Sequence, residues 1–310
     1  MKIAVVGAGF CGVAACCELL GIKGVSVDLF DAKGLGGGAS GCAAGLLHPC
    51  PGEQGRRSWM ADAGMQATLD LVAVSEKALG VSVADRSGIL RIGAIDKLYP
   101  DIVFQGKDTY LITSGVTIYP ELYLEGLWKH CQEKGARLVL TQIDSLSQLE
   151  GYDKIILTVG AGIFGFEECG HLKLGKTKGQ ALVCKLPEGV ARFERSIVAK
   201  GYIATGSAPD HFYVGSTYER DTVSFKPNLE AALADLQPKV DLIAPHLGPL
   251  NVLECRAGVR VSPIGHYIPL LEKINGRCYA ITGMGSRGLL YHAYFAKLLK
   301  EQLLINATIV

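Results

Sequence analysis

The residues best suited to chemistry at the start of the chain form a glycine-rich turn. Gly7-Ala8-Gly9-Phe10-Cys11-Gly12 follows the apolar run 2–6 and has the spacing of the G-x-G-x-x-G dinucleotide-binding fingerprint. Gly7 permits a tight turn, Gly9 lets the backbone approach a pyrophosphate, and Gly12 lets the following helix pack closely on the strand. The phosphates would bind the free N–H groups at the positive end of that helix.

The segments after the turn complete this signal. Residues 13–20 are apolar on all sides, as expected of a helix buried against a sheet, and residues 25–30 form a second apolar strand. Asp31 ends that strand, where an acidic side chain can accept hydrogen bonds from a ribose diol. This order of elements favours a nucleotide-binding β-α-β unit over a glycine-rich turn in an ordinary α/β protein.

Three further stretches of small residues can lie against a bulky, flat ligand. The first is the glycine-dense segment 34–49, the second is Gly160-Ala161-Gly162 after a predicted strand at 154–159, and the third is the turn 283–289 between a predicted strand and the last helix. The predicted cofactor-binding residues are Gly7, Gly9, Phe10, Cys11, Gly12, Asp31, Ala32, Ser40, Gly41, Gly45, Leu46, Ile143, Gly160, Ala161, Gly162, Gly283, Gly285, Ser286, Arg287, Gly288 and Leu289.

The remaining pattern predicts an α/β fold of two parts. Apolar residues at helical spacing predict helices over 59–79, 120–135, 228–236, 240–244 and 289–304. Short strands are predicted at 88–93, 110–113, 137–140 and 278–282. Between residues 179 and 223 the chain changes to short aromatic and β-branched segments, at 180–185, 201–205 and 212–214, which are typical of an antiparallel sheet.

Composition limits the partners of the chain. The 310 residues include 31 basic and 30 acidic side chains, so there is no overall charge for binding nucleic acid or an anionic membrane. The ten cysteines lack a C-x-x-C pair, so we expect buried thiols in a reducing cytoplasm and no metal site. No run of eighteen apolar residues occurs, so we expect no transmembrane span.

Together these segments resemble the D-amino-acid-oxidase-like flavoproteins, which include glycine oxidase and sarcosine oxidase. The resemblance covers nearly the whole chain. Within that family, the segments 215–221 and 283–289 look most like the C-terminal oxidase domain of the bifunctional enzyme that makes 5-methylaminomethyl-2-thiouridine in tRNA. The other matching segments are the glycine fingerprint with Asp31, 39–49, 115–120, 160–162, Lys178-Gly179-Gln180, and Ala257-Gly258-Val259-Arg260 followed by Ser262-Pro263.

The resemblance implies FAD held in a Rossmann-like domain, with a substrate domain built on an antiparallel sheet inserted into it. We expect the FAD-binding domain to comprise residues 1–85, 120–170 and 250–310, and the substrate domain to comprise 86–119 and 171–249. The resemblance also implies oxidation of a small-molecule amine or amino acid.

Four residues are predicted to act at the substrate. Relatives place a carboxylate-binding arginine at the motif position of Arg260, and Arg287 in the last glycine turn is a second candidate that faces substrate or flavin. Tyr218, together with His266 and Tyr267, would line the pocket, and His48 would tune the flavin or relay a proton. The alternatives are surface salt bridges for the arginines and structural roles for the others.

The expected reaction is hydride transfer to flavin from the carbon next to the amine nitrogen, followed by hydrolysis of the imine. Oxygen and a quinone both remain open as electron acceptors. One alternative is a tRNA wobble-uridine carboxymethylaminomethyl oxidase, which the near-neutral charge disfavours although Lys173, Lys176 and Lys178 form a small basic cluster. Others are a non-catalytic flavin-binding protein and, from the first motif alone, an NAD-dependent dehydrogenase.

Overall fold

A mostly parallel sheet surrounds the N-terminal strand in the computed structural model, which describes residues 1–220 and 224–308. In that part of the chain the sheet has six strands in the order β16-β17-β10-β1-β2-β9, and all neighbours are parallel except β16 and β17. The strands are β1 (Lys2–Val6), β2 (Ser26–Asp31), β9 (Arg137–Leu140), β10 (Lys154–Leu157), β16 (Leu270–Lys273) and β17 (Cys278–Thr282).

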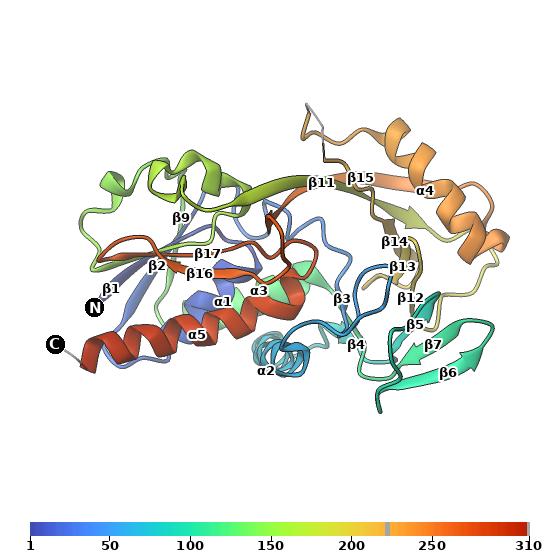
Figure 1. The fold of residues 1–310 in the computed structure, drawn as a ribbon, viewed down its shortest axis with the longest axis horizontal. Coiled ribbons are helices and arrows are strands. Elements are labelled where there is room, and N and C mark those ends of the chain that lie inside the picture. Colours follow the sequence, from blue (N-terminus) through green and yellow to red (C-terminus); the bar gives the residue numbers. More distant parts are fainter. Residues whose placement is uncertain (221–223, 309–310) are drawn as a thin grey trace.

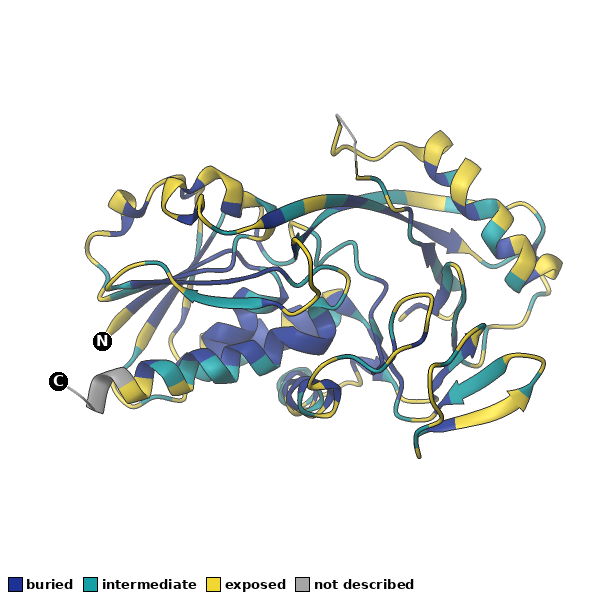
Figure 2. Ribbon diagram, viewed as in Figure 1, coloured by how far each residue is buried: buried dark blue, intermediate teal, exposed yellow. Residues whose placement is uncertain are grey.

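Four helices pack together beside this sheet (Figure 1). They are α1 (Phe10–Leu19), α2 (Ala61–Leu79), α3 (Pro120–Glu133) and α5 (Gly288–Thr308). Helix α1 contacts α3 and α5, and α2 contacts the same two helices. Figure 2 shows α1 almost wholly buried, as its apolar sequence predicts, because it lies between the sheet and the other helices.

The second sheet is almost entirely antiparallel. Within the described residues it has eight strands in the order β15-β11-β14-β13-β12-β5-β7-β6, and only β12 and β5 run parallel. Helix α4 (Leu229–Ile243) packs on β11 and β14. The strands are β5 (Ile89–Ile92), β6 (Ile102–Gly106), β7 (Thr109–Ile112), β11 (Leu174–Lys185), β12 (Ser196–Val198), β13 (Tyr202–Thr205), β14 (His211–Gly215) and β15 (Asn251–Pro263).

A small sheet and four short 3-10 helices complete the described elements. The small sheet, in the order β3-β8-β4, links residues after the glycine-dense segment to the segment before α3. Its strands are β3 (Leu46–Leu47), β4 (Ala84–Asp85) and β8 (Val116–Ile118), and the 3-10 helices are η1 (Leu146–Leu149), η2 (Gly160–Gly165), η3 (Glu167–Cys169) and η4 (Pro245–Leu247).

The predicted α/β fold with a parallel and an antiparallel part is confirmed, but its longest strands were missed in part. β11 begins at Leu174, earlier than predicted, and the whole of β15 was not predicted. The two strands pair along their length, from Leu174 opposite Pro263 to Lys185 opposite Asn251, and arch between the two halves in Figure 1. β15 therefore lies in the antiparallel sheet, whereas residues 250–310 were assigned to the FAD-binding domain. The domain boundaries themselves stay a prediction.

Other local differences are small. The turn predicted after residue 100 leads into β6, which pairs with β7 as a hairpin. The two predicted helical segments around residue 240 form the single helix α4, which contains Pro238. All ten cysteines are free thiols, and none of the described helices is long and apolar enough to cross a membrane.

Candidate active site

A cavity of about 1530 Å³ is lined by both large sheets and brings most of the predicted site residues together. It is large enough for a dinucleotide and a small substrate, since pockets for drug-sized ligands are roughly 300–1,000 Å³. The predicted residues that line it are Gly7, Gly9, Phe10, Cys11, Asp31, Ala32, Ser40, Gly45, Leu46, His48, Ile143, Gly160, Ala161, Gly162, Tyr218, Arg260, Gly283, Gly285, Ser286, Arg287, Gly288 and Leu289.

Two of the predicted glycines lie behind the cavity wall. A Cβ atom on Gly12 would lie 1.8 Å from the carbonyl oxygen of Gly7, and one on Gly41 would lie 2.4 Å from the carbonyl oxygen of Gly36. Neither residue is among those lining the cavity. Both glycines therefore act by letting two backbone segments approach each other, which for Gly12 is the reason expected from the fingerprint.

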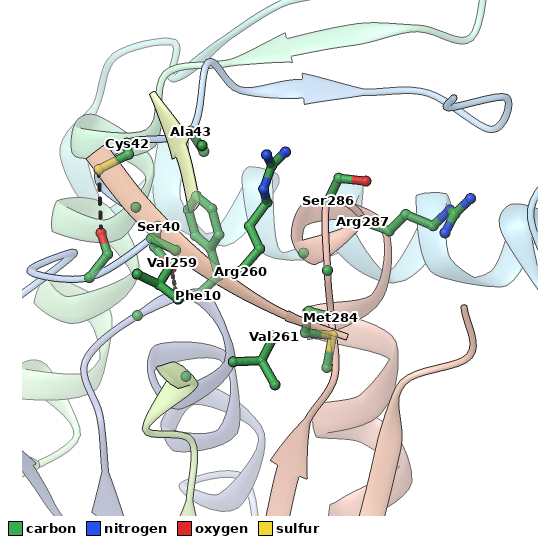
Figure 3. A pocket seen from close by; sticks show the side chains of 18 of the residues that line it. Phe10, Ser40, Cys42, Ala43, Val259, Arg260, Val261, Met284, Ser286 and Arg287 are labelled. Atoms are coloured by element: carbon green, nitrogen blue, oxygen red, sulfur yellow. Dashed lines mark hydrogen bonds between the residues drawn. The ribbon is translucent and has the colours of Figure 1, made fainter. Parts of the chain in front are cut away.

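The dinucleotide end of the cavity is fixed by two side chains from outside α1. The Asp31 carboxylate accepts hydrogen bonds from the backbone N–H groups of Ala8 at 2.8 Å and Lys33 at 2.7 Å. Ser40 Oγ accepts the N–H of Phe10 at 3.0 Å, a bond drawn in Figure 3. Because Gly9 before the helix has no side chain to cap α1, Ser40 supplies the first capping oxygen.

The last glycine turn lies at the other end of the cavity and leads into α5. Gly285 has a φ of +53° and donates its N–H to the carbonyl oxygen of Val261 at 2.7 Å. Gly45, on the wall formed before β3, has a φ of +82°, and a Cβ atom there would lie 1.7 Å from the carbonyl oxygen of Ile118. These positions keep the wall flat and free of side chains.

His48 is buried in this wall. Burial, with the positive charge of Arg91 as a smaller cause, lowers the pKa of His48 to about 4. Its Nδ1 has no hydrogen-bond partner within the described residues. The imidazole is therefore neutral near pH 7, which suits a hydrogen bond to a ligand in the cavity better than the predicted proton relay.

Arg260 extends from β15 into the cavity (Figure 3). Its Nη2 donates to the carbonyl oxygen of Thr217 at 3.0 Å and its Nη1 to Ser216 Oγ at 3.3 Å. Gly179 on β11 makes room for it, because a Cβ atom there would lie 2.5 Å from Nη2. Among residues 1–220 and 224–308, no carboxylate pairs with Arg260 and no acceptor reaches its buried Nε. Burial lowers the pKa of this guanidinium.

Arg287 lies in the turn before α5 and also lines the cavity. Its guanidinium carbon lies 4.6 Å from the centre of the Tyr267 ring, and its buried Nε has no partner in the part of the chain that is described. Burial lowers the pKa of Arg287. The surface salt bridge considered for each arginine is therefore absent among residues 1–220 and 224–308, and both have the surroundings of ligand-binding cations.

The remaining predicted pocket residues lie at the edge. Tyr218 and Tyr267 line the cavity but are largely exposed, with 61% and 68% of their surface accessible. The hydrogen bond from Arg220 lowers the pKa of Tyr218. His266 lies outside the cavity and accepts the N–H of Ile268 at 3.2 Å. Asp221, at the end of the segment that begins at residue 215, lies outside the described residues.

One basic residue considered for phosphate binding is engaged within the protein. Lys178 is buried, and its Nζ lies 3.3 Å from a carboxylate oxygen of Glu219. Glu219 also accepts hydrogen bonds from Gln180 at 3.0 Å and Thr217 at 2.6 Å. This network shapes the strand and loop beside Arg260 and leaves Lys178 unavailable to an external phosphate.

Sequence reasoning missed Arg91, a fully buried arginine on β5. Its guanidinium donates to the carbonyl oxygens of Ala94 at 2.7 Å, Gly52 at 2.8 Å and Glu53 at 2.8 Å. These bonds hold the loop 50–56, which forms part of the cavity wall. A single arginine in a short strand carries no local signal of this role, because its acceptors are about forty positions earlier in the chain.

The family described as "DAO: FAD dependent oxidoreductase" matches residues 2–102 and 89–302. A tRNA 5-methylaminomethyl-2-thiouridine biosynthesis bifunctional protein from Vibrio cholerae is 22% identical over 192 residues, which are 53% of this chain and 28% of that protein. The chain thus matches little more than a quarter of this relative's length. No cluster of side chains able to hold a metal ion occurs among the described residues.

Solved structures share the whole fold. Glycine oxidase from Geobacillus kaustophilus superimposes with a TM-score of 0.79 at 16% identity, covering 96% of this chain and 93% of that one. Iminodiacetate oxidase from Chelativorans sp. BNC1 gives a TM-score of 0.79 at 20% identity, covering 98% and 95%. At these identities the likeness establishes the arrangement of the two sheets and not the substrate.

Proposed function

The chain belongs to the FAD-dependent oxidoreductase family, and from that membership we propose that it oxidises an amino-acid-like amine at the carbon next to nitrogen. FAD is the cofactor of this family, so the NAD-dependent alternative drawn from the first motif is wrong. The family includes oxidases and dehydrogenases of amino acids. The substrate, the electron acceptor and the roles of individual residues are our proposals.

The cavity fits FAD in its length and in its walls. Asp31, at the end of β2, would bind the adenosine ribose with the lone pairs that its backbone partners leave free. The N-terminus of α1 would bind the pyrophosphate. The flavin would lie against Gly45, whose wall a Cβ atom would obstruct, and near the unpartnered Nδ1 of His48.

FAD, when bound, supplies the acceptor for a hydride from the carbon next to the amine nitrogen. The protein's task is then to hold that carbon in one place and orientation. Arg260 would do so by pairing its guanidinium with a substrate carboxylate, since the planar group can bind both oxygens. After oxidation, water splits the substrate imine into a carbonyl compound and an amine.

The observation that carries this proposal is the state of Arg260. It is a partly buried cation in the cavity with no carboxylate partner among the described residues and with an unsatisfied Nε. Removing a charge from water without a counter-ion is costly, and a hydrogen bond to a charged group contributes about 1.5–3 kcal/mol. A substrate carboxylate would satisfy the group that the protein leaves unpaired.

Product analysis tests the proposal. FAD-loaded protein is incubated with glycine, sarcosine, proline and D-amino acids, once in air and once without air in the presence of a quinone. We expect one class of amine to yield a carbonyl product and an amine in equal amounts, and the productive acceptor identifies an oxidase or a dehydrogenase. Protein that retains FAD and forms no product with any amine or acceptor would favour the non-catalytic alternative.

The tRNA alternative has one supporting observation, the match to half of this chain in the Vibrio cholerae protein. Burial of Lys178 in an ion pair weakens the basic cluster that would contact phosphates. The discriminating substrate is tRNA carrying carboxymethylaminomethyluridine, added to the same panel. Glyoxylate released from this tRNA, but not from small amines, would replace the small-molecule proposal.

A further inference from the structure

The cavity carries an excess of positive charge, although the whole chain has 31 basic against 30 acidic residues. This excess is local to the cavity. Among the described residues that line it, the basic ones are Lys33, Arg56, Arg57, Lys200, Arg220, Lys239, Arg260 and Arg287, and the acidic ones are Asp31, Glu53 and Asp144. A cleft lined mainly by one sign of charge concentrates ligands of the opposite sign.

Some of these cations are neutralised within the protein. Arg57 pairs with Asp101 at 3.2 Å, and Lys239 pairs with Asp235 at 2.7 Å. Such pairs need no ligand. They show how this chain normally supplies a carboxylate to a basic residue at the cavity wall.

Arg260 and Arg287 are different from these pairs. Among residues 1–220 and 224–308, neither has a carboxylate within ion-pair distance, and each has a buried Nε without an acceptor. Burial lowers the pKa of both guanidinium groups. Two desolvated cations in one cavity repel each other, and two ligand carboxylates would remove both the repulsion and the unsatisfied donors.

The two arginines reach the cavity from separate elements. Arg260 is on β15, while Arg287 lies in the turn before α5, and Figure 3 shows them extending on either side of Ser286. Tyr267 stacks on Arg287, and Thr217 accepts a hydrogen bond from Arg260, so each guanidinium is held by its own neighbour. This placement suits two anionic groups joined by a short linker better than one carboxylate shared by both arginines.

We propose that the amine oxidised in this site is an amino- or imino-dicarboxylate, with one carboxylate bound by Arg260 and the other by Arg287. This inference rests on the proposed function, since it takes amine oxidation as the reaction. The C–H bond next to nitrogen breaks, a hydride and the proton from nitrogen pass to FAD, and water splits the imine into a carbonyl compound and an amine. Both carboxylates remain in the products.

Binding of unreactive analogues tests the inference without turnover. Thiodiacetate carries two carboxylates on either side of a sulfur that replaces the amine, and (methylthio)acetate carries one. Each is titrated into the FAD-loaded protein, and the change in the flavin spectrum gives the dissociation constant. We expect thiodiacetate to bind at least about tenfold more tightly, and equal dissociation constants would overturn the inference.

The Arg287→Met variant locates the second carboxylate. It should weaken thiodiacetate by about tenfold or more and leave (methylthio)acetate within about twofold. The matched control is Lys200→Met, which removes an exposed cation from the same cavity and should preserve the preference. Loss of the preference in Lys200→Met alone, or equal weakening of both analogues in Arg287→Met, would contradict the assignment of Arg287.

Two further measurements keep the outcomes separate. The FAD content of Arg287→Met is measured first, and Arg287→Lys, which retains the charge, replaces it if FAD is lost. In that case Arg287→Lys should weaken thiodiacetate more than (methylthio)acetate, and equal weakening would count against the second site. If sarcosine and iminodiacetate are oxidised equally well, the dicarboxylate inference fails while amine oxidation stands. If thiodiacetate is preferred but no amine is oxidised, the proposed function fails while the anion site stands.

Discussion

The backbone N–H of Gly285 donates a hydrogen bond of 2.7 Å to the carbonyl oxygen of Val261. Val261 follows Arg260 on β15, and Gly285 lies in the turn that leads into α5. This bond joins the strand that carries our proposed carboxylate-binding residue to the turn proposed to lie against FAD. The spacing between substrate and cofactor is therefore set by backbone contacts, which position a group more firmly than a flexible side chain does.

Gly12 should tolerate no side chain. In Gly12→Ala the new Cβ would lie 1.8 Å from the carbonyl oxygen of Gly7, so α1 must move away from β1 and deform the proposed pyrophosphate site. We expect a loss of about 3 kcal/mol in the free energy of unfolding and a reduced FAD content. Urea unfolding and the ratio of FAD to protein measure these effects.

Gly38→Ala is the matched control for that substitution. Gly38 lies in the glycine-dense segment, and a Cβ atom there would meet nothing within 4 Å. Its free energy of unfolding should stay within about 0.5 kcal/mol of the wild type. Equal stability of the two variants would contradict the close packing of α1 on the glycine turn.

Arg91 should stabilise the fold through backbone acceptors. In Arg91→Met the carbonyl oxygens of Gly52, Glu53 and Ala94 lose their donors inside the protein. We expect a cost of about 3 kcal/mol in the free energy of unfolding and faster proteolysis of the loop 50–56. Arg86→Met is the control, because Arg86 forms an exposed pair with Glu76 that contributes about 1 kcal/mol or less. Similar costs for both variants would refute the anchoring role.

Two buried histidines should make the protein less stable as the pH falls. Burial lowers the pKa of His292 from 6.5 to about 4, and that of His48 likewise. The unfolded chain therefore binds protons between about pH 6.5 and pH 4 that the folded chain does not bind, and each histidine costs up to about 3 kcal/mol over that range. Urea unfolding of the FAD-loaded protein across this range measures the loss.

The His292→Gln variant isolates one contribution. His292 accepts a hydrogen bond from Tyr123 at 2.7 Å, so the variant should be less stable at pH 7. Its stability should nevertheless change less between pH 6.5 and pH 4, because one of the two groups has been removed. An unchanged pH dependence would show that His292 is protonated as readily in the folded protein as in the unfolded chain.

The N-terminal unit was predictable because its signals are local. The run 2–31 contains a strand, its glycine turn, a helix and the next strand in order, and the structure forms β1, α1 and β2 there with small shifts at the ends. Asp31 and the first glycines line the cavity as expected. Only the role of Ser40, which caps α1 from outside the helix, depends on a contact that the local pattern does not contain.

The pairing of β11 with β15 was not predictable in the same way. Leu174 lies opposite Pro263, far along the chain, and the burial of β15 does not alternate clearly between its two faces. Strand formation there depends on a partner rather than on local preference. Arg260 was singled out by its motif alone, and the strand that directs it into the cavity was seen only in the structure.

The charge of the cavity was hidden by the overall composition. Arg56, Lys200 and Arg287 belong to loops that are remote in sequence, and each is an ordinary basic residue in its local context. A formal net charge of +1 gives no sign that such residues gather around one cavity. Their grouping follows from the packing of the two sheets.

The most direct test of the account is anaerobic titration of the FAD-loaded protein with amines and amino acids, followed by the absorbance of the flavin. We predict that a carboxylate-bearing amine bleaches the wild-type protein, and that Arg260→Met retains FAD but is reduced at least about a hundredfold more slowly. Arg256→Met, on the same strand but paired with Glu121 and outside the cavity, should be bleached like the wild type. Equal bleaching of Arg260→Met and wild type would contradict the central claim that Arg260 holds the substrate carboxylate.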